Sequence, residues 1–241
     1  MAAFRRALAI GVDAVELDVH LSADGEPVII HDPALARTTD GSGLVSEHTA
    51  AALQRLDAGR WFGKPFAGER IPSLAEALDL LRPVGVIIEI KNGPIYYPKI
   101  AARVAEVVKA SGHAAVTASS FDHHVLPEIA ALAPEVDTAV LFTARPIDPV
   151  RLARDAGARR LHPQWAFATP DLLEAARAAG LRVDTWTVND VPEMARLAAA
   201  GVDGIITNFP DRLRATLAAL GDPLPVVPGS PPVPSQERTT D

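Results

Sequence analysis

The stretch AAGLRVDTWTVNDVPEMARLAAAGVDGIIT, residues 178–207, holds the end of one helix, a strand, a complete helix and the start of another strand. Each alanine-rich helical segment ends at a glycine, Gly180 or Gly201, and a β-rich segment follows directly. Glycine commonly ends helices, and a repeated helix–glycine–strand order is typical of βα units. The stretch therefore predicts a parallel sheet covered by helices, either an open doubly wound sheet or a barrel.

The same alternation runs through most of the chain. Strands are expected at residues 14–21, 85–91, 115–121, 137–142, 159–163, 182–188 and 204–209. Helix starts are indicated by Asp148 before Pro149, Thr169 before Pro170, and the capping-box spacing of Ser73 and Glu76. No G-x-G-x-x-G follows any of these strands, so the main signature of a dinucleotide-binding sheet is missing.

Polar side chains gather instead near the carboxyl ends of several predicted strands: Glu16, Asp18, Glu89, Lys91, Ser119, Ser120, His162, Trp186 and Asn208. Sites assembled from many strand ends are typical of (β/α)8 barrels. We therefore expect an α/β fold of the TIM (β/α)8 type. The count of parallel strands is only seven, because residues 2–11 indicate a helix with no strand before it. We expect the first strand of the barrel to be missing from this chain, which would leave two sheet edges open.

Two further segments complete the expected organisation. PVIIHD, residues 27–32, lies just after the first strand and is predicted to pair with it as a hairpin. We expect one barrel domain over residues 1–221, with a small β-hairpin insertion near residues 21–72. Residues 223–234 contain six prolines, so residues 222–241 are expected to form a disordered tail.

Composition excludes several classes of function. The formal net charge of −7 argues against nucleic acid as the main partner. The absence of cysteine excludes disulfides, a thiolate nucleophile and a zinc–thiolate site. No apolar run reaches the roughly 18–20 residues that span a bilayer, so no integral membrane segment is expected. We expect a cytoplasmic protein, with an upstream signal peptide left open; oligomeric state is not predicted.

The first strand carries the main chemical signal. Glu16, Asp18 and His20 alternate, so they project from one face of the strand. Two carboxylates about 6–7 Å apart along a strand make a poor core and a good cation clamp. The alternative is an ordinary edge strand with one wet face, or a structural ion-pair network.

Several motifs then match a known family. They are GVDAVELDVHLSADGEPVIIHDPALARTTDGSGLVSE (11–47), FAGERIPSLAEAL (66–78), IIEIKNG (87–93), DTWTVN (184–189) and GVDGIITNFP (201–210). Together they closely resemble bacterial glycerophosphodiester phosphodiesterases, from about Phe4 to Leu213. The resemblance implies a TIM barrel that hydrolyses glycerophosphodiesters to sn-glycerol 3-phosphate and an alcohol. It also implies one divalent cation, Mg²⁺ or Ca²⁺, and a small-molecule glycerophosphodiester substrate.

The resemblance also implies roles for individual residues. Glu16, Asp18 and Glu89 would be the metal carboxylates, and Lys91 would meet the phosphate as a point charge. His31 would be one of two histidines that act as general acid and base. His162 and Trp186 are candidates for substrate binding, with an ordinary place in the core as the alternative for Trp186.

Other histidines receive different expectations. His20 is expected to be a satisfied polar residue beneath the site, and His123 and His124 are expected on the surface or in a loop. Asn208 is given no charge role.

The chain departs from the family at its start. The family carries a strand with H-R-G and then P-E-N before the first helix, and neither motif is in this sequence. The expected losses are the second catalytic histidine, a phosphate-binding arginine and the first strand. A misplaced start, a fragment and a degenerate gene product are all compatible with this. The alternatives in function are a non-catalytic relic that binds metal or phosphodiester, and a diesterase acting on lysophospholipids.

Overall fold

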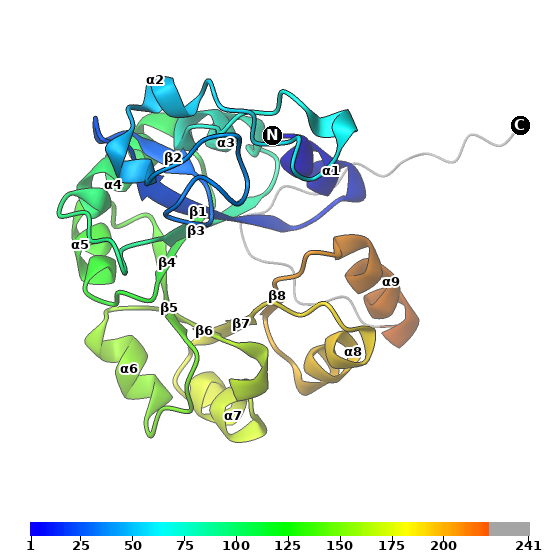
Figure 1. The fold of residues 1–241 in the computed structure, drawn as a ribbon. Helices are drawn as coiled ribbons and strands as arrows, with labels where there is room; N and C mark the ends of the chain where they lie inside the picture. The colour runs from blue at the N-terminus through cyan, green and yellow to red at the C-terminus, as the bar shows by residue number, and fades with distance from the viewer. Residues whose placement is uncertain (222–241) are drawn as a thin grey trace, which may run out of the picture.

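A computed structural model describes residues 1–221 of the chain, and its centre is one curled sheet (Figure 1). The strands are β1 Ala14–Leu21, β2 Pro27–Ile29, β3 Gly85–Ile90, β4 Val116–Ser120, β5 Asp137–Phe142, β6 Arg160–Pro163, β7 Arg182–Thr185 and β8 Gly204–Ile205. They lie in the order β2-β1-β3-β4-β5-β6-β7-β8. All neighbours pair in parallel except β1 and β2, which form the predicted hairpin. The α/β barrel-type fold is confirmed.

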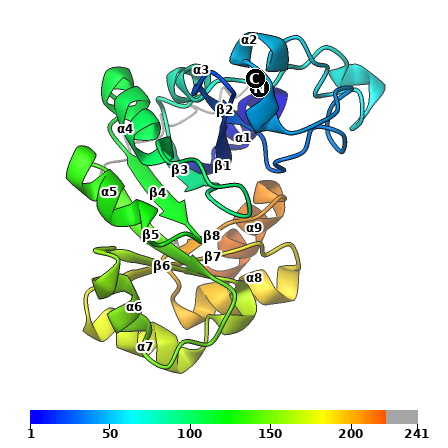
Figure 2. The same ribbon diagram turned by 60° about the vertical axis from the view of Figure 1, so that its left-hand side comes forward.

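Helices cover the outer face of this sheet (Figure 2). They are α1 Ala2–Ile10, α2 Ala50–Leu53, α3 Leu74–Leu80, α4 Ile100–Ser111, α5 Val125–Leu132, α6 Pro149–Asp155, α7 Pro170–Ala178, α8 Val191–Ala200 and α9 Pro210–Leu220, with short 3-10 turns η1 Val45–Glu47, η2 Lys64–Phe66 and η3 Trp165–Phe167. The Ser73–Glu76 capping box and the Asp148 N-cap are both formed as predicted.

The alternation along each strand separates the core from the site. On β1, Leu17 and Val19 pack with helix residues in the outer core. Glu16 and Asp18 therefore project to the inner face, because successive side chains point to opposite faces. The register pairs Asp18 with Glu89 of β3, so the two carboxylates lie side by side.

The sheet is open rather than closed. Within residues 1–221, β8 pairs with β7 alone, and the first half of β1 pairs with β3 alone. Figure 1 shows β1 and β8 as the two strands that face each other across the opening. The seven parallel strands and the unclosed sheet agree with the prediction.

The segment between β2 and α3 forms a small subregion with its own core. Its buried side chains are Val28, Ile30, Leu35, Val45, Leu53 and Ile71. This subregion corresponds to the insertion expected near residues 21–72, while the division of the chain into domains stays a prediction. The expected tail, residues 222–241, lies outside the described residues. Within residues 1–221, no helix is both long and apolar enough to cross a membrane.

Candidate active site

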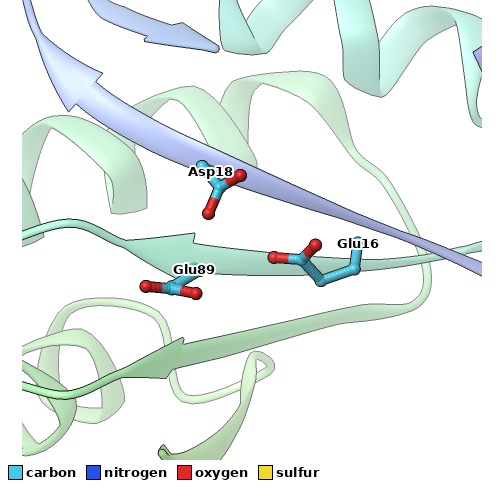
Figure 3. A group of neighbouring side chains, drawn as sticks. All are labelled: Glu16, Asp18 and Glu89. Atoms are coloured by element: carbon cyan, nitrogen blue, oxygen red, sulfur yellow. The ribbon is translucent and has the colours of Figure 1, made fainter. Parts of the chain in front are cut away.

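Three carboxylates converge on the inner face of β1 and β3. Oxygens of Glu16, Asp18 and Glu89 all lie within 4.8 Å of one another. Figure 3 shows the three side chains pointing into one shared space, two from β1 and one from β3. Carboxylate oxygens gathered in this way are ligands that Mg²⁺ and Ca²⁺ prefer. The alternation in the sequence predicted this grouping on β1, and the parallel register adds Glu89.

The electrostatics of this cluster indicate an excess of negative charge. Burial, followed by the charges of Asp18 and Glu89, raises the pKa of Glu16 well above its usual value. Burial also raises the pKa of Glu89, and the charge of Asp18 adds to this against the opposing effect of Lys91. A group of carboxylates that resists full ionisation is stabilised by a nearby cation. The donor set therefore fits a hard divalent cation.

Lys91 supplies part of the compensating charge. Its Nζ lies 2.9 Å from Oδ1 of Asp18 and 2.5 Å from Oε1 of Glu89. Burial would lower the pKa of Lys91, but the charges of Asp18 and Glu89 outweigh it and the pKa is raised. The ammonium group is therefore held charged beside the carboxylates of Asp18 and Glu89, while its role toward phosphate stays a prediction.

His31 lies at the end of β2, beside the cluster. Its side chain is 65% exposed, and its Nδ1 lies 2.6 Å from Oδ1 of Asp32. Asp32 also accepts hydrogen bonds from Nε and Nη2 of Arg37. The hydrogen bond from Arg37 holds the pKa of Asp32 well below its usual range. The anionic Asp32 therefore fixes Nδ1–H of His31 and leaves Nε2 free to exchange a proton.

His20 is a structural residue under this site. It is 2% exposed, with Nδ1 3.1 Å from the hydroxyl of Tyr97 and Nε2 3.2 Å from the carbonyl oxygen of His31. Both ring nitrogens are engaged, so the expectation of a satisfied polar residue beneath the site agrees with the structure. Burial lowers the pKa of His20. The hydrogen bond to His31 ties β1 to the end of β2.

His162 and Trp186 lie in contact but differ in burial. His162 is fully buried, and its Nε2 lies 3.0 Å from Oδ2 of Asp184. The substrate-binding role predicted for His162 stays a prediction. Trp186 is partly exposed, donates from Nε1 to the carbonyl oxygen of His162, and packs edge-to-face on Phe121. Its role toward substrate stays a prediction.

The expectation that His123 and His124 lie on the surface or in a loop is met, because both lie in the turn before α5. His124 is exposed, and His123 is partly buried with Nε2 2.8 Å from the carbonyl oxygen of Leu141. Asn208 is exposed.

Sequence reasoning did not assign a role to Asp32 or Arg37, or to the buried pair of Arg160 and Asp184, whose Nη1 and Oδ2 are 2.8 Å apart. For Asp32, the one local signal was its position directly after His31.

Comparisons with known proteins identify the family. The glycerophosphoryl diester phosphodiesterase family matches residues 1–212. A glycerophosphodiester phosphodiesterase of Caldanaerobacter subterraneus subsp. tengcongensis is 39% identical over 216 residues, covering 88% of this chain and 89% of the relative. The chain belongs to the glycerophosphoryl diester phosphodiesterase family.

Solved structures of family members have the same fold. A phosphodiesterase of Oleispira antarctica, solved with the product sn-glycerol-3-phosphate, gives a TM-score of 0.84 at 31% identity, covering 90% of each chain. A glycerophosphodiester phosphodiesterase of Agrobacterium tumefaciens gives 0.77 at 32% identity, covering 88% of this chain and 90% of that one. In this family member β1 and β3 bring together Glu16, Asp18, Glu89 and Lys91, and the His31–Asp32 pair follows β2.

Proposed function

We propose that the chain hydrolyses glycerophosphodiesters to sn-glycerol 3-phosphate and an alcohol, with the help of a divalent cation. The observation that carries the proposal is the convergence of Glu16, Asp18 and Glu89 within 4.8 Å, next to Lys91. The names of the relatives and the product bound to the Oleispira enzyme support it. The alcohol and the choice between Mg²⁺ and Ca²⁺ are left open by these observations.

Glu16, Asp18 and Glu89 are the residues that would hold the cation. When bound, the cation would supply Lewis-acid polarisation of a phosphoryl oxygen. Lys91 adds a fixed positive charge on the same side of the phosphoryl group. This charge favours the transition state, in which negative charge grows on the phosphoryl oxygens.

His31 is the proposed proton-transfer residue. Asp32 accepts the hydrogen bond from Nδ1–H, so Nε2 is the atom that takes or gives the proton. A base at this position removes a proton from a water molecule as the water oxygen forms the new P–O bond. The P–O bond to the alcohol breaks, sn-glycerol 3-phosphate is left, and the alcohol oxygen takes up a proton from solvent.

A second candidate is binding of cation and phosphodiester without turnover. One observation favours it: within residues 1–221, the histidine next to His31 is His20, and both of its ring nitrogens are already engaged. The general acid and general base of this reaction are usually two separate groups. His31 alone supplies only one of them.

The deciding experiment measures glycerol 3-phosphate released from glycerophosphocholine by the chain as given, with Mg²⁺, with Ca²⁺ and with a chelator. Chelator-sensitive release at about 1–10³ s⁻¹ supports hydrolysis. Cation binding by calorimetry without release supports the binding-only candidate. Absence of both contradicts the assignment of the carboxylates. Glu106→Gln, which changes an exposed glutamate on α4, serves as the matched control.

A further inference from the structure

A loop in the subregion between β2 and α3 presents three aromatic side chains to solvent. Trp61 is 52% exposed, Phe62 is 70% exposed and Phe66 is 37% exposed. The rings form a row of edge-to-face contacts, with centroids 5.6 Å apart between the first pair and 5.4 Å between the second. A contiguous group of exposed aromatic rings on a globular protein indicates an interaction surface.

The loop is held in a fixed conformation. Oxygens of Asp57 accept hydrogen bonds from the backbone nitrogens of Gly59, Arg60 and Gly68 at 2.8–3.0 Å. Gly59 packs against the backbone of Phe66 so closely that a Cβ atom there would lie 1.9 Å from its carbonyl oxygen. The aromatic rings are therefore displayed by a built scaffold, which reduces the entropy lost on binding.

The aromatic residues share their loop with three basic residues, of which Arg60 has its Nε 3.4 Å from Oδ2 of Asp57. Arg60, Lys64 and Arg70 are all exposed, and we call residues 59–70 the aromatic–basic loop. Its one carboxylate, Glu69, pairs with the amino group of Met1 3.0 Å away. The chain as a whole carries a formal net charge of −7. The loop is therefore basic, whereas the chain as a whole is acidic.

The loop also lies close to His31. Trp61 and His31 both line one cavity of about 200 Å³. The turn η2, which contains Lys64 and Phe66, protrudes at the periphery of the molecule in both ribbon views (Figures 1 and 2).

We propose that the aromatic–basic loop binds the surface of a bilayer that contains anionic phospholipids. Tryptophan and phenylalanine rings enter the interfacial region of a bilayer, where their apolar area leaves water. Arginine and lysine side chains in the same loop pair with anionic headgroups. The acidic remainder of the protein would be repelled by the same surface, so this loop orients the molecule. Docking places His31 next to the headgroup layer.

The test is co-sedimentation of the full chain with two kinds of sucrose-loaded vesicle. One kind contains phosphatidylcholine alone, and the other contains phosphatidylcholine with about 30% phosphatidylglycerol. We expect binding to the anionic vesicles that weakens when salt is raised from about 0.1 M to about 0.5 M. Phe62→Ser should weaken it about tenfold, because the ring of Phe62 no longer enters the interface. Tyr96→Ser, at a 71% exposed aromatic residue outside the loop, should leave it unchanged.

Two results would overturn the proposal. Equal sedimentation of the parent chain and Phe62→Ser would mean that the loop does not mediate binding. A concentration-dependent dimer in light scattering that Phe62→Ser abolishes, without vesicle binding, would mean that a second copy covers the rings. Circular dichroism of the Phe62→Ser variant checks that its fold is unchanged. The assay needs no turnover, so its outcome is separate from that of the proposed hydrolysis.

Discussion

Lys91 bridges two neighbouring strands through its ammonium group, 2.9 Å from Asp18 on β1 and 2.5 Å from Glu89 on β3. Within residues 1–221, Lys91 is the one ammonium group paired with the carboxylates of the cluster. Burial, followed by the charges of Asp18 and Glu89, keeps the pKa of Glu16 raised against the opposing charge of Lys91. Lys91 and a bound divalent cation together would balance the three carboxylates.

Lys91→Met is expected to lower the free energy of unfolding by about 3 kcal/mol in the presence of chelator, because it leaves partly buried carboxylates without a counter-charge. Added Mg²⁺ or Ca²⁺ should recover part of the loss. Urea unfolding with and without cation measures both effects. Lys99→Met, at an exposed lysine before α4, is the control. A cation effect no larger in Lys91→Met than in the control would contradict the shared site.

Glu16→Gln and Asp18→Asn are each expected to weaken cation binding at least about tenfold, which is ~1.4 kcal/mol. The reason is that each change removes a charged oxygen donor from a set of three. Titration calorimetry with MgCl₂ and CaCl₂ gives the dissociation constants directly. If both variants bind as tightly as the parent chain and Glu106→Gln, the cation is held elsewhere.

His31→Gln is expected to lower kcat by about 10²–10⁴-fold in a chain that turns over, because Nε2 no longer exchanges a proton. Asp32→Asn should lower kcat by a smaller factor with little change in KM, since Asp32 is expected to act by orienting the His31 ring. Steady-state kinetics with glycerophosphocholine separates the two parameters. A rise in KM with kcat unchanged would assign the pair to substrate binding instead.

Asp184 makes a predictable contribution to acid stability. Burial alone would raise its pKa, but the hydrogen bond from His162 and the charge of Arg160 lower it to about 2. A folded-state pKa below the ordinary value of 3.8 means that the stabilisation is present above about pH 4 and is lost as pH falls through 2.

The size of this contribution is about 2 kcal/mol. The difference in unfolding free energy between the parent chain and Asp184→Asn should therefore narrow as pH is lowered from 5 to about 2.5. Urea unfolding across this range tests it, with Asp79→Asn as the control at a 77% exposed carboxylate. A difference that stays constant with pH would show that Asp184 is not held ionised by its partners.

Gly59→Ala is expected to destabilise the aromatic–basic loop, at a cost of about 2 kcal/mol or more, because the added methyl group would overlap the backbone of Phe66. Gly63→Ala is the matched control in the same loop, since its Cβ would have no neighbour nearer than 3.7 Å. Thermal unfolding compares the two. Proteolysis within residues 59–68 should increase only for Gly59→Ala.

Local sequence signals predicted the strands well. The alternation of residues 14–21 reproduces β1 residue for residue, because one face of that strand lies in the core and the other faces the site. The prediction was too long for the last strand: residues 204–209 were expected, and only Gly204–Ile205 pair. Within residues 1–221, β8 pairs with β7 alone. No strand on its other edge is there to support a longer β8.

Local sequence patterns could not predict side-chain contacts between residues that are far apart in the sequence. His162 stands at a strand end and was a candidate for the pocket, but Asp184 and Trp186, more than 20 residues later, determine that it is buried. Arg37 lies in a loop with no periodic pattern, and its pairing with Asp32 depends on how that loop folds back. Such placements are decided by tertiary packing, which spacing alone does not encode.

The open side of the sheet has a consequence for the motion of β1. The first half of β1 is held by backbone hydrogen bonds to β3 alone within residues 1–221, and this half carries Glu16. A divalent cation bound by carboxylates of both β1 and β3 would add a further link between these two strands. Amide hydrogen exchange of residues 14–18 should then slow on cation binding, whereas exchange in β5 should not change. The fraction of the protein that has a cation bound would therefore also determine how stably β1 is held on the sheet.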